Sequence, residues 1–169
     1  MGFSAGAELA AASAVFYPQF NETKQADDPF ASVSARPDFV GIIYPGPSPF
    51  AKNRTAPPIP RDVPPAFVMC GGSGDRVHAI WAMEYFNAML NAGVPNIEMH
   101  IYGNGRHPGD QLSDGSRMSA GLSDRNGIPF GTWQDRFIDW IRDLGFLDAP
   151  GTETKAAKDV AAYAKKHGK

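Results

Sequence analysis

Apolar residues gather in three short segments, at residues 38–44, 65–70 and 96–102. The segment at 65–70 is a continuous apolar run that ends in a glycine loop, which is typical of a buried strand. The segment at 96–102 alternates Ile97, Met99 and Ile101 with polar neighbours, which is the period of a β-strand. We therefore predict three strands along the chain.

Helical patterns lie around these segments. Residues 5–16 are rich in alanine, the residue with the highest helix propensity. Residues 77–94 repeat apolar side chains at helical spacing, which predicts a helix that faces a core and ends at Gly93 and Pro95. The members of this stripe are Val77, Ile80, Trp81, Tyr85 and Met89.

Two more helices are predicted near the C-terminus. Residues 133–147 place their large apolar side chains on one face, whereas residues 155–169 form a weaker pattern that either docks on a neighbour or frays. The first face consists of Trp133, Phe137, Trp140, Ile141 and Leu144, and the second of Ala157, Val160, Ala161 and Ala164. Proline interrupts residues 17–37 and 45–64, which we expect to be loops.

Composition narrows the choice of partners. The 169 residues carry a net charge of −2 with a pI near 6.0, so the chain lacks the basic footprint of a nucleic-acid-binding protein. No run of 18 apolar residues suggests a membrane span, and no signal-peptide pattern is evident, which favours a cytoplasmic location. Cys70 lies in an apolar strand and is expected to be a small buried hydrophobe. Neither a metal nor a cofactor is expected, because His, Cys, Asp and Glu show no metal-ligand spacing.

Three residues carry candidate chemistry. Ser4 is the centre of Gly2-Phe3-Ser4-Ala5-Gly6, a Gly-x-Ser-x-Gly turn at the start of a predicted helix. Asp75 and His107 each follow a predicted strand on a glycine-rich loop. A serine hydroxyl becomes nucleophilic when an imidazole accepts its proton, and a carboxylate fixes the tautomer of that imidazole. Ser4, His107 and Asp75 are therefore candidates for nucleophile, base and acid.

The order Ser, Asp, His, together with the phrases "NAGVP", "EMHIYGNGRH" and "DWIRDLGFL", resembles the α/β-hydrolase superfamily. The resemblance is to its esterase/lipase branch, which includes acetyl-xylan-esterase-like enzymes, and it covers residues 2–147. Pro108 stands where that family more often has glycine. The resemblance implies a truncated α/β-hydrolase, the C-terminal half beginning at its nucleophile turn. Its expected architecture is three-layer αβα with a small, mainly parallel sheet of about three strands. Residues 1–150 would form this partial domain, and residues 151–169 a helical tail.

The implied activity is that of a serine carboxylesterase, which hydrolyses small acyl esters through an acyl-enzyme. The backbone N–H of Ala5 would be one oxyanion donor, and the second normally comes from an upstream loop that this chain lacks. Reduced activity is therefore expected. The alternative is a weak or inactive hydrolase remnant that persists as an oligomeric scaffold. An uncovered sheet edge predicts a homodimer or higher homo-oligomer in either case.

Other interpretations of the same residues remain open. Ser4 could be only a helix N-cap, and Asp75 could cap the helix that follows it. Asp110 and Asp114 are substitutes for the catalytic acid. His100 lies within a strand pattern and is expected to be structural, whereas His78 and His167 are expected to be solvated. The glycine- and serine-rich residues 103–131 form a loop long enough to border the site.

Overall fold

A parallel sheet of four strands forms the centre of the computed structural model, which describes residues 1–23, 27–103, 105–109, 115 and 133–168. The strand order is β1-β2-β3-β4. The strands are β1 (Gly2–Phe3), β2 (Val40–Ile43), β3 (Ala66–Gly71) and β4 (Ile97–Tyr102). The three predicted strands are confirmed, but the expected count of about three is too low. The additional strand, β1, pairs only Gly2 and Phe3 with β2, and two residues are too few to show a period.

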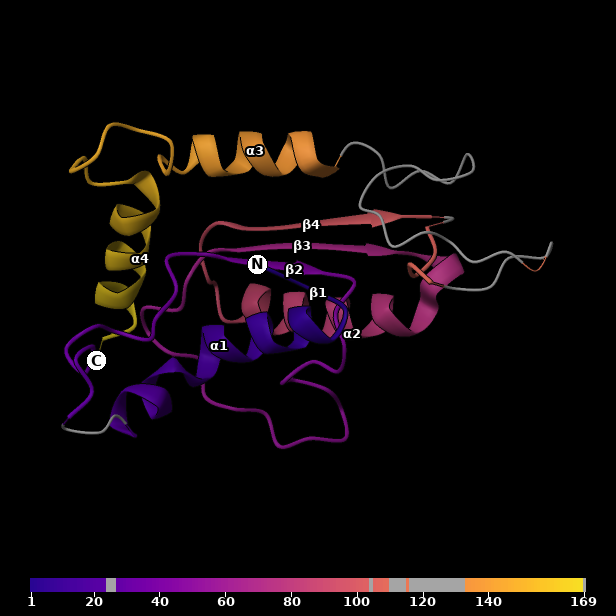
Figure 1. The fold of residues 1–169 in the computed structure, drawn as a ribbon, viewed down its shortest axis with the longest axis horizontal. Coiled ribbons are helices and arrows are strands. Elements are labelled where there is room, and N and C mark those ends of the chain that lie inside the picture. Colours follow the sequence, from indigo (N-terminus) through magenta and orange to yellow (C-terminus); the bar gives the residue numbers. More distant parts are fainter. Residues whose placement is uncertain (24–26, 104, 110–114, 116–132, 169) are drawn as a thin grey trace.

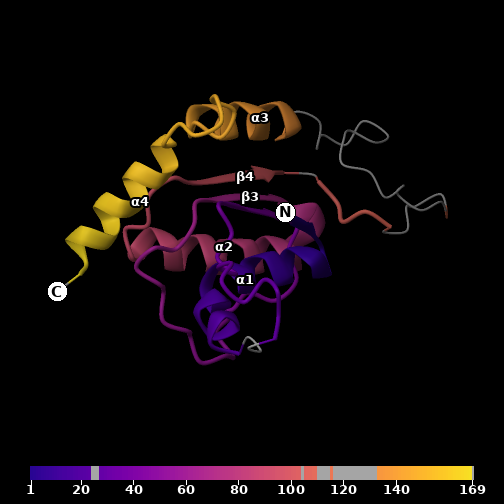
Figure 2. The ribbon, with the colours of Figure 1, turned by 60° about the vertical axis from the view of Figure 1, so that its left-hand side comes forward.

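Helices cover both faces of this sheet, which gives three layers (Figure 1). Helices α1 (Ala5–Glu22) and α2 (Arg76–Asn91) lie on one face, and α3 (Trp133–Asp143) lies on the other. A short 3-10 helix, η1 (Ser73–Asp75), leads from β3 into α2. Helix α4 (Lys155–Lys166) stands at the end of the sheet where β3 and β4 begin, as both Figure 1 and Figure 2 show.

Strand side chains alternate between two hydrophobic cores. Ile42 and Val68 join the core under α1 and α2, whereas Phe67 and Met69 pack with Trp133 on the α3 side. All of β2 and β3 is buried, as expected of parallel strands covered on both faces. This double burial explains why residues 65–70 show an apolar run and no alternation.

Both predicted helices on the first face are present, but the end of one and the buried face of the other differ from the prediction. Helix α1 continues through Pro18 to Glu22, although residues 17–37 were expected to form a loop. Contacts distant in sequence support this extension, because the Tyr17 hydroxyl donates to Asp62 and the Asn21 side chain accepts from the Ala35 N–H at 2.7 Å.

The predicted apolar stripe of α2 is only partly its buried face. Tyr85 and Met89 are buried, but Val77 is 54% exposed and Ile80 is 38% exposed. Alanines replace them on the buried face, which consists of Ala79, Ala82, Tyr85 and Met89. Small side chains let the helix approach the sheet closely, so the largest residues of the pattern are not all in the core.

The two C-terminal helices dock on the same chain. The predicted face of α3 is confirmed for Trp133 and Trp140, which are buried. In α4 the contact is made by Ala156, Val160 and Tyr163, whose hydroxyl donates to the Ala92 carbonyl at 3.1 Å. The predicted face is confirmed at Val160, which is buried, but it is wrong at Ala157 and Ala161, which are exposed.

Cys70 is buried, as predicted. Burial, with a smaller contribution from the nearby Asp75 carboxylate, raises the pKa of its thiol to about 12. Among the residues that the structure describes, no helix is both long and apolar enough to cross a membrane. Most of the predicted functional loop at residues 103–131 lies outside the described residues, as do Asp110 and Asp114.

Candidate active site

The carboxyl ends of the four parallel strands lie on one side of the sheet, and open α/β sheets bind their ligands at these ends (Figure 1). Ser4 follows β1, Tyr44 follows β2, Asp75 follows β3 and His107 follows β4. The topology therefore brings all three predicted site residues, together with Tyr44, to the carboxyl ends of the strands.

Ser4 has a strained backbone. Its φ of 52° and ψ of −121° lie in a region that non-glycine residues rarely adopt. The surrounding chain fixes it there, because its N–H donates to the Ile43 carbonyl at 3.0 Å and its own carbonyl accepts from Gly46 at 3.2 Å. The side chain makes no capping hydrogen bond to α1, so the N-cap interpretation is not supported.

The first glycine of the turn is required by the space available. A Cβ at Gly2 would lie 1.9 Å from the Gly6 carbonyl oxygen, far inside contact distance. A Cβ at Gly6 would meet nothing within 4 Å. Only the first of the two glycines therefore explains how the turn brings β1 and α1 so close together.

His107 contacts the hydroxyl of Ser4. Its Nε2 lies 2.9 Å from Ser4 Oγ, and its Nδ1 lies 2.9 Å from the carbonyl oxygen of Pro108. A carbonyl only accepts hydrogen bonds, so Nδ1 carries the hydrogen and Nε2 of the neutral ring presents its lone pair. The Ser4 hydroxyl then donates to Nε2, which is the arrangement that a general base needs.

Asp75 does not bond to His107 in the described part of the chain. Its Oδ1 lies 2.5 Å from Nδ1 of His78, and its Oδ2 is buried with no hydrogen-bond partner among the described residues. Asp75 makes no capping hydrogen bond to α2 either. The direct acid–base contact that the resemblance implied is therefore absent, and the role of Asp75 as catalytic acid stays a prediction.

His78 occupies the position between these two residues, which corrects the expectation that it is solvated. Its ring is about one-fifth exposed and stacks on the ring of His107, with centroids 4.3 Å apart and planes at 25°. Asp75 and His78 are three residues apart, a spacing that puts two side chains on the same side of a helical turn. That spacing was a signal in the sequence, but a three-residue pair recurs in any helix.

Backbone hydrogen bonds tie the loop that bears Asp75 to the loop that bears His107. Gly72 donates to the Tyr102 carbonyl at 2.8 Å, and Ser73 donates to the Gly103 carbonyl at 3.0 Å. Gly105 also donates to Tyr102, at 2.9 Å. The two loops thus continue the pairing of β3 with β4 beyond the strands, and this fixes how His107 approaches the acid loop.

Tyr44 is a site residue that sequence reasoning missed. Its ring meets the ring of His107 edge to face, with centroids 5.1 Å apart, and burial raises the pKa of its hydroxyl. Its φ of 38° is also strained, and its N–H donates to the Met69 carbonyl at 2.6 Å. The one signal in the sequence was its position at the end of a predicted strand, where side chains reach the edge of the sheet.

The first turn of α1 offers donors for an anion. The N–H groups of Ala7 and Glu8 bond to the Ser4 carbonyl, which leaves those of Ala5 and Gly6 without a backbone acceptor among the described residues. The positive end of the helix dipole lies at the same place. The Ala5 N–H thus lies next to the nucleophile in the position expected of an oxyanion donor.

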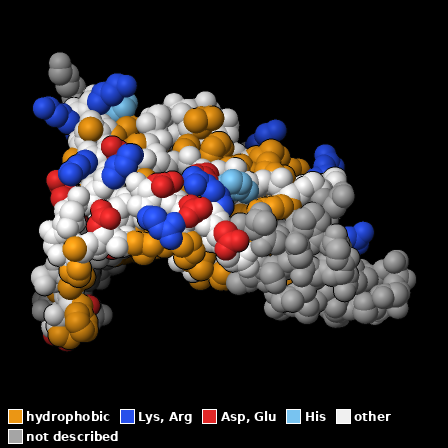
Figure 3. Space-filling view, turned by 90° about the horizontal axis from the view of Figure 1, so that it is seen from above, with side chains coloured by type: hydrophobic (Ala, Val, Ile, Leu, Met, Phe, Trp, Pro, Cys, Tyr) orange, Lys and Arg blue, Asp and Glu red, His pale blue; other side chains and the backbone are white. Residues whose placement is uncertain are grey.

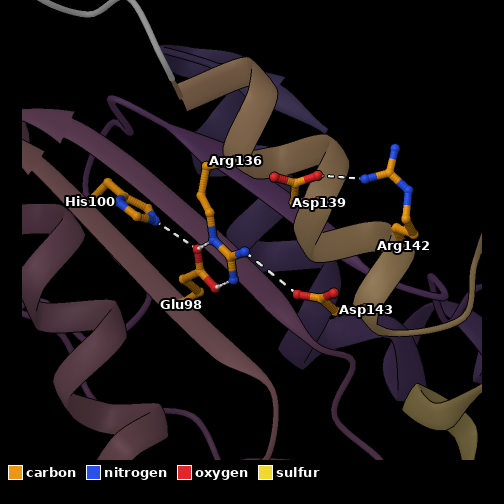
Figure 4. A network of polar contacts seen from close by, with 6 residues as sticks. All are labelled: Glu98, His100, Arg136, Asp139, Arg142 and Asp143. Carbon is orange, nitrogen blue, oxygen red and sulfur yellow. Dashed lines mark hydrogen bonds and ion pairs between the residues drawn. The ribbon is translucent and has the colours of Figure 1, made fainter.

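A second polar cluster joins β4 to α3 (Figure 4). Arg136 of α3 donates through Nε at 2.6 Å and Nη2 at 2.5 Å to the two oxygens of Glu98, which also bonds to His100. Burial raises the pKa of Glu98, but the hydrogen bonds from Arg136 and His100 outweigh it, so the pKa is below its usual value. His100 also stacks on Phe67, which fits the structural role expected for it.

A surface hollow beside α2 and a charged surface on the α3 side lie outside this candidate site. A hollow of about 460 Å³ on the outer side of α2, lined by Ile80, Met83 and Leu90 among others, contains none of the predicted site residues. On the α3 side of the molecule, acidic and basic side chains are intermingled (Figure 3).

Among the described residues, no group of three or more His, Cys, Asp or Glu side chains is placed to hold a metal ion.

No protein-family model matches the chain, and comparisons with curated proteins and with solved structures found no match.

Proposed function

We propose that the chain is a serine carboxylesterase that hydrolyses small acyl esters, with Ser4 as nucleophile and His107 as general base. One observation carries the proposal. The hydroxyl of Ser4, on a strained backbone, lies 2.9 Å from the Nε2 of His107, a residue 103 positions away in the sequence. Strain of this kind persists only where the surroundings enforce it, and it clusters at functional sites.

The proposed reaction begins with proton transfer from Ser4 Oγ to His107 Nε2 while Oγ attacks the ester carbonyl. The Ala5 N–H donates to the oxyanion of the tetrahedral intermediate. His107 then returns the proton to the departing alkoxide, which leaves an acyl group on Ser4. Water then attacks this acyl-enzyme while His107 Nε2 accepts its proton, and His107 returns the proton to Ser4 Oγ as the bond to the acyl group breaks and the carboxylic acid is released.

Two groups support the imidazolium that forms during each half-reaction, one as a hydrogen-bond acceptor and one through its charge. The Pro108 carbonyl holds the hydrogen on Nδ1 and thereby keeps Nε2 directed at Ser4. The carboxylate of Asp75 supplies negative charge nearby, which stabilises the protonated ring without direct contact. We infer membership of the α/β-hydrolase superfamily from the same pattern, since Ser4, Asp75 and His107 follow the parallel strands β1, β3 and β4 in that order.

Ester hydrolysis tests this proposal. We expect purified protein to hydrolyse p-nitrophenyl acetate, and Ser4→Ala to abolish the reaction while the thermal transition is unchanged. Ser13→Ala is the matched control, because it removes another hydroxyl from α1, one that donates only to the Ala10 carbonyl at 2.8 Å. Equal turnover by Ser4→Ala and wild type would exclude Ser4 as nucleophile. A folded but inactive wild type would favour the scaffold alternative.

We also propose that the chain associates with a second copy of itself. Strand β1 is an edge strand of the sheet, and the apolar side chains of Met1, which precedes it, and Leu9, on the helix that follows it, are 59% and 71% exposed. An edge strand next to apolar surface favours pairing with another chain. A two-fold dimer is the commonest closed arrangement.

A further inference from the structure

We propose that His78 is a positioning residue of the catalytic centre, which holds the Asp75 carboxylate at its edge and supports the His107 ring on its face. The kinetic part of this inference rests on the proposed function. Its geometric part, that His78 sets the orientation of His107, does not.

The Nδ1–H of His78 donates a hydrogen bond to the buried carboxylate of Asp75. The Asp75 side chain is only 7% exposed, and the His78 Nδ1–H is the one hydrogen-bond donor to its carboxylate within the described residues. A carboxylate accepts and never donates, so Nδ1 of His78 must carry the hydrogen. Without this donor the carboxylate would be buried and unpaired, a state that costs more than the hydrogen bond itself contributes.

The face of His78 fixes the plane of the base. The ring of His107 lies between His78, stacked at 4.3 Å, and Tyr44, edge-on at 5.1 Å. His78 is itself packed against Trp81, with centroids 5.3 Å apart and planes at 86°. These contacts restrict rotation of the His107 ring, and they keep its Nε2 directed at Ser4.

This arrangement explains how an acid that does not touch the base still serves it. Within the described residues, the groups that contact His107 are Ser4, Tyr44, the Pro108 carbonyl and His78, and Asp75 is bonded to Nδ1 of His78. The Asp75 carboxylate is thus coupled to His107 through the stacked ring of His78, and a negative charge on it attracts the His107 ring when that ring takes the proton from Ser4.

Two substitutions each remove one of the two contacts of the His78 ring, the hydrogen bond to Asp75 or the stacking on His107. His78→Phe keeps an aromatic face but loses the donor, whereas His78→Asn keeps an N–H donor near the position of Nδ1 but loses the ring. We expect each to lower kcat by about 10²-fold with KM nearly unchanged, since His78 does not touch substrate and a small displacement of the base is costly. His167→Asn is the control, because His167 lies in the exposed tail and should leave both constants unchanged.

A double-mutant cycle tests whether Asp75 acts through His78. We expect Asp75→Asn combined with His78→Phe to be no slower than the more damaging single variant, as residues that act as a unit are not additive. If the two losses instead multiply, Asp75 and His78 act independently and the proposed positioning role is wrong.

A measurement that needs no activity keeps this inference distinct from the proposed function. At about pH 8, above the ordinary pKa of histidine, the ring ¹⁵N shifts of His107 should report a single tautomer with hydrogen on Nδ1. In His78→Phe and His78→Asn we expect those shifts to change toward a mixture of tautomers. Unchanged His107 shifts in both folded variants would overturn the positioning role, whereas an inactive wild type would overturn only the esterase.

Discussion

Ser4 keeps its positive φ because its neighbours leave no alternative. The Ser4 N–H is bound to β2, and its carbonyl is bound to α1 and to Gly46. The same close approach excludes a side chain at Gly2. The motif therefore depends on steric contacts, because Gly2 has no side chain and leaves the space that the strained backbone of Ser4 requires.

This steric account predicts unequal effects for the two glycines of the turn. Gly2→Ala should destabilise the protein by roughly 1–3 kcal/mol or more, because overpacking moves the backbone of β1 or α1. Gly6→Ala has open space for its Cβ and should leave the melting temperature nearly unchanged. Thermal unfolding followed by circular dichroism measures both. Equal melting temperatures for the two variants would contradict the close contact at Gly2.

A second residue-scale prediction concerns two tyrosines. The Tyr85 hydroxyl is buried without a hydrogen-bond partner among the described residues, and burial raises its pKa. Tyr85→Phe should therefore be neutral or stabilising. Tyr163→Phe loses the bond to the Ala92 carbonyl and should cost about 0.5–1.5 kcal/mol. Chemical denaturation compares the two directly, and a large loss in Tyr85→Phe would show that its hydroxyl has a partner after all.

Sequence reasoning worked best for elements with a strong apolar run or a strong apolar period. The strands at β2, β3 and β4 and the apolar face of α3 follow from their patterns, because burial on one or two faces requires them. Helix α2 was also predicted, but its buried face only in part, since that face uses alanines that carry little signal. Strand β1 was missed because pairing with β2, and no propensity of its own, makes it a strand.

The candidate site shows the same division. Ser4 and His107 were found from a motif and from their order after strands, and the structure brings them together. The His78–Asp75 contact and the position of Tyr44 depend on how three loops pack at one edge, which a sequence pattern does not encode. The direct bond expected from Asp75 to His107 was therefore the prediction that the sequence supported least.

At the scale of elements, the Glu98–Arg136 pair should make the attachment of α3 depend on pH. The pKa of Glu98 is lowered in the folded state, so the stabilisation is present above the unfolded value near 4.5 and is lost as pH falls through the folded value. Glu98→Gln should lower the melting temperature at pH 7, and the difference from wild type should shrink below about pH 4.

Asp139→Asn is the control for this prediction. Asp139 pairs with Arg142 on the same helix, but both side chains are more than half exposed, and such pairs contribute little. Melting temperatures recorded from pH 7 to about pH 3 compare the variants. A difference between Glu98→Gln and wild type that does not change with pH would show that the lowered pKa of Glu98 does not couple to folding.

The molecule as a whole presents an open edge at β1 and a site at the carboxyl end of the same strand. We expect sedimentation velocity at micromolar concentration to show a dimer. Leu9→Lys should weaken it, because the substitution places a charge on the exposed apolar surface of α1, the helix that follows β1. Glu153→Lys, on the exposed surface before α4, is the control for an added positive charge. A wild type that sediments as a monomer would contradict association through this edge.

The central claim is that Ser4 is a nucleophile activated by His107, and covalent labelling tests it most directly. A serine-reactive fluorophosphonate should modify the wild-type protein once, and peptide mass spectrometry should locate the label on Ser4. The label should be absent from Ser4→Ala, strongly slowed in His107→Ala, and unchanged in Ser13→Ala. Labelling at another serine, or labelling of Ser4 at the same rate in His107→Ala, would contradict the account.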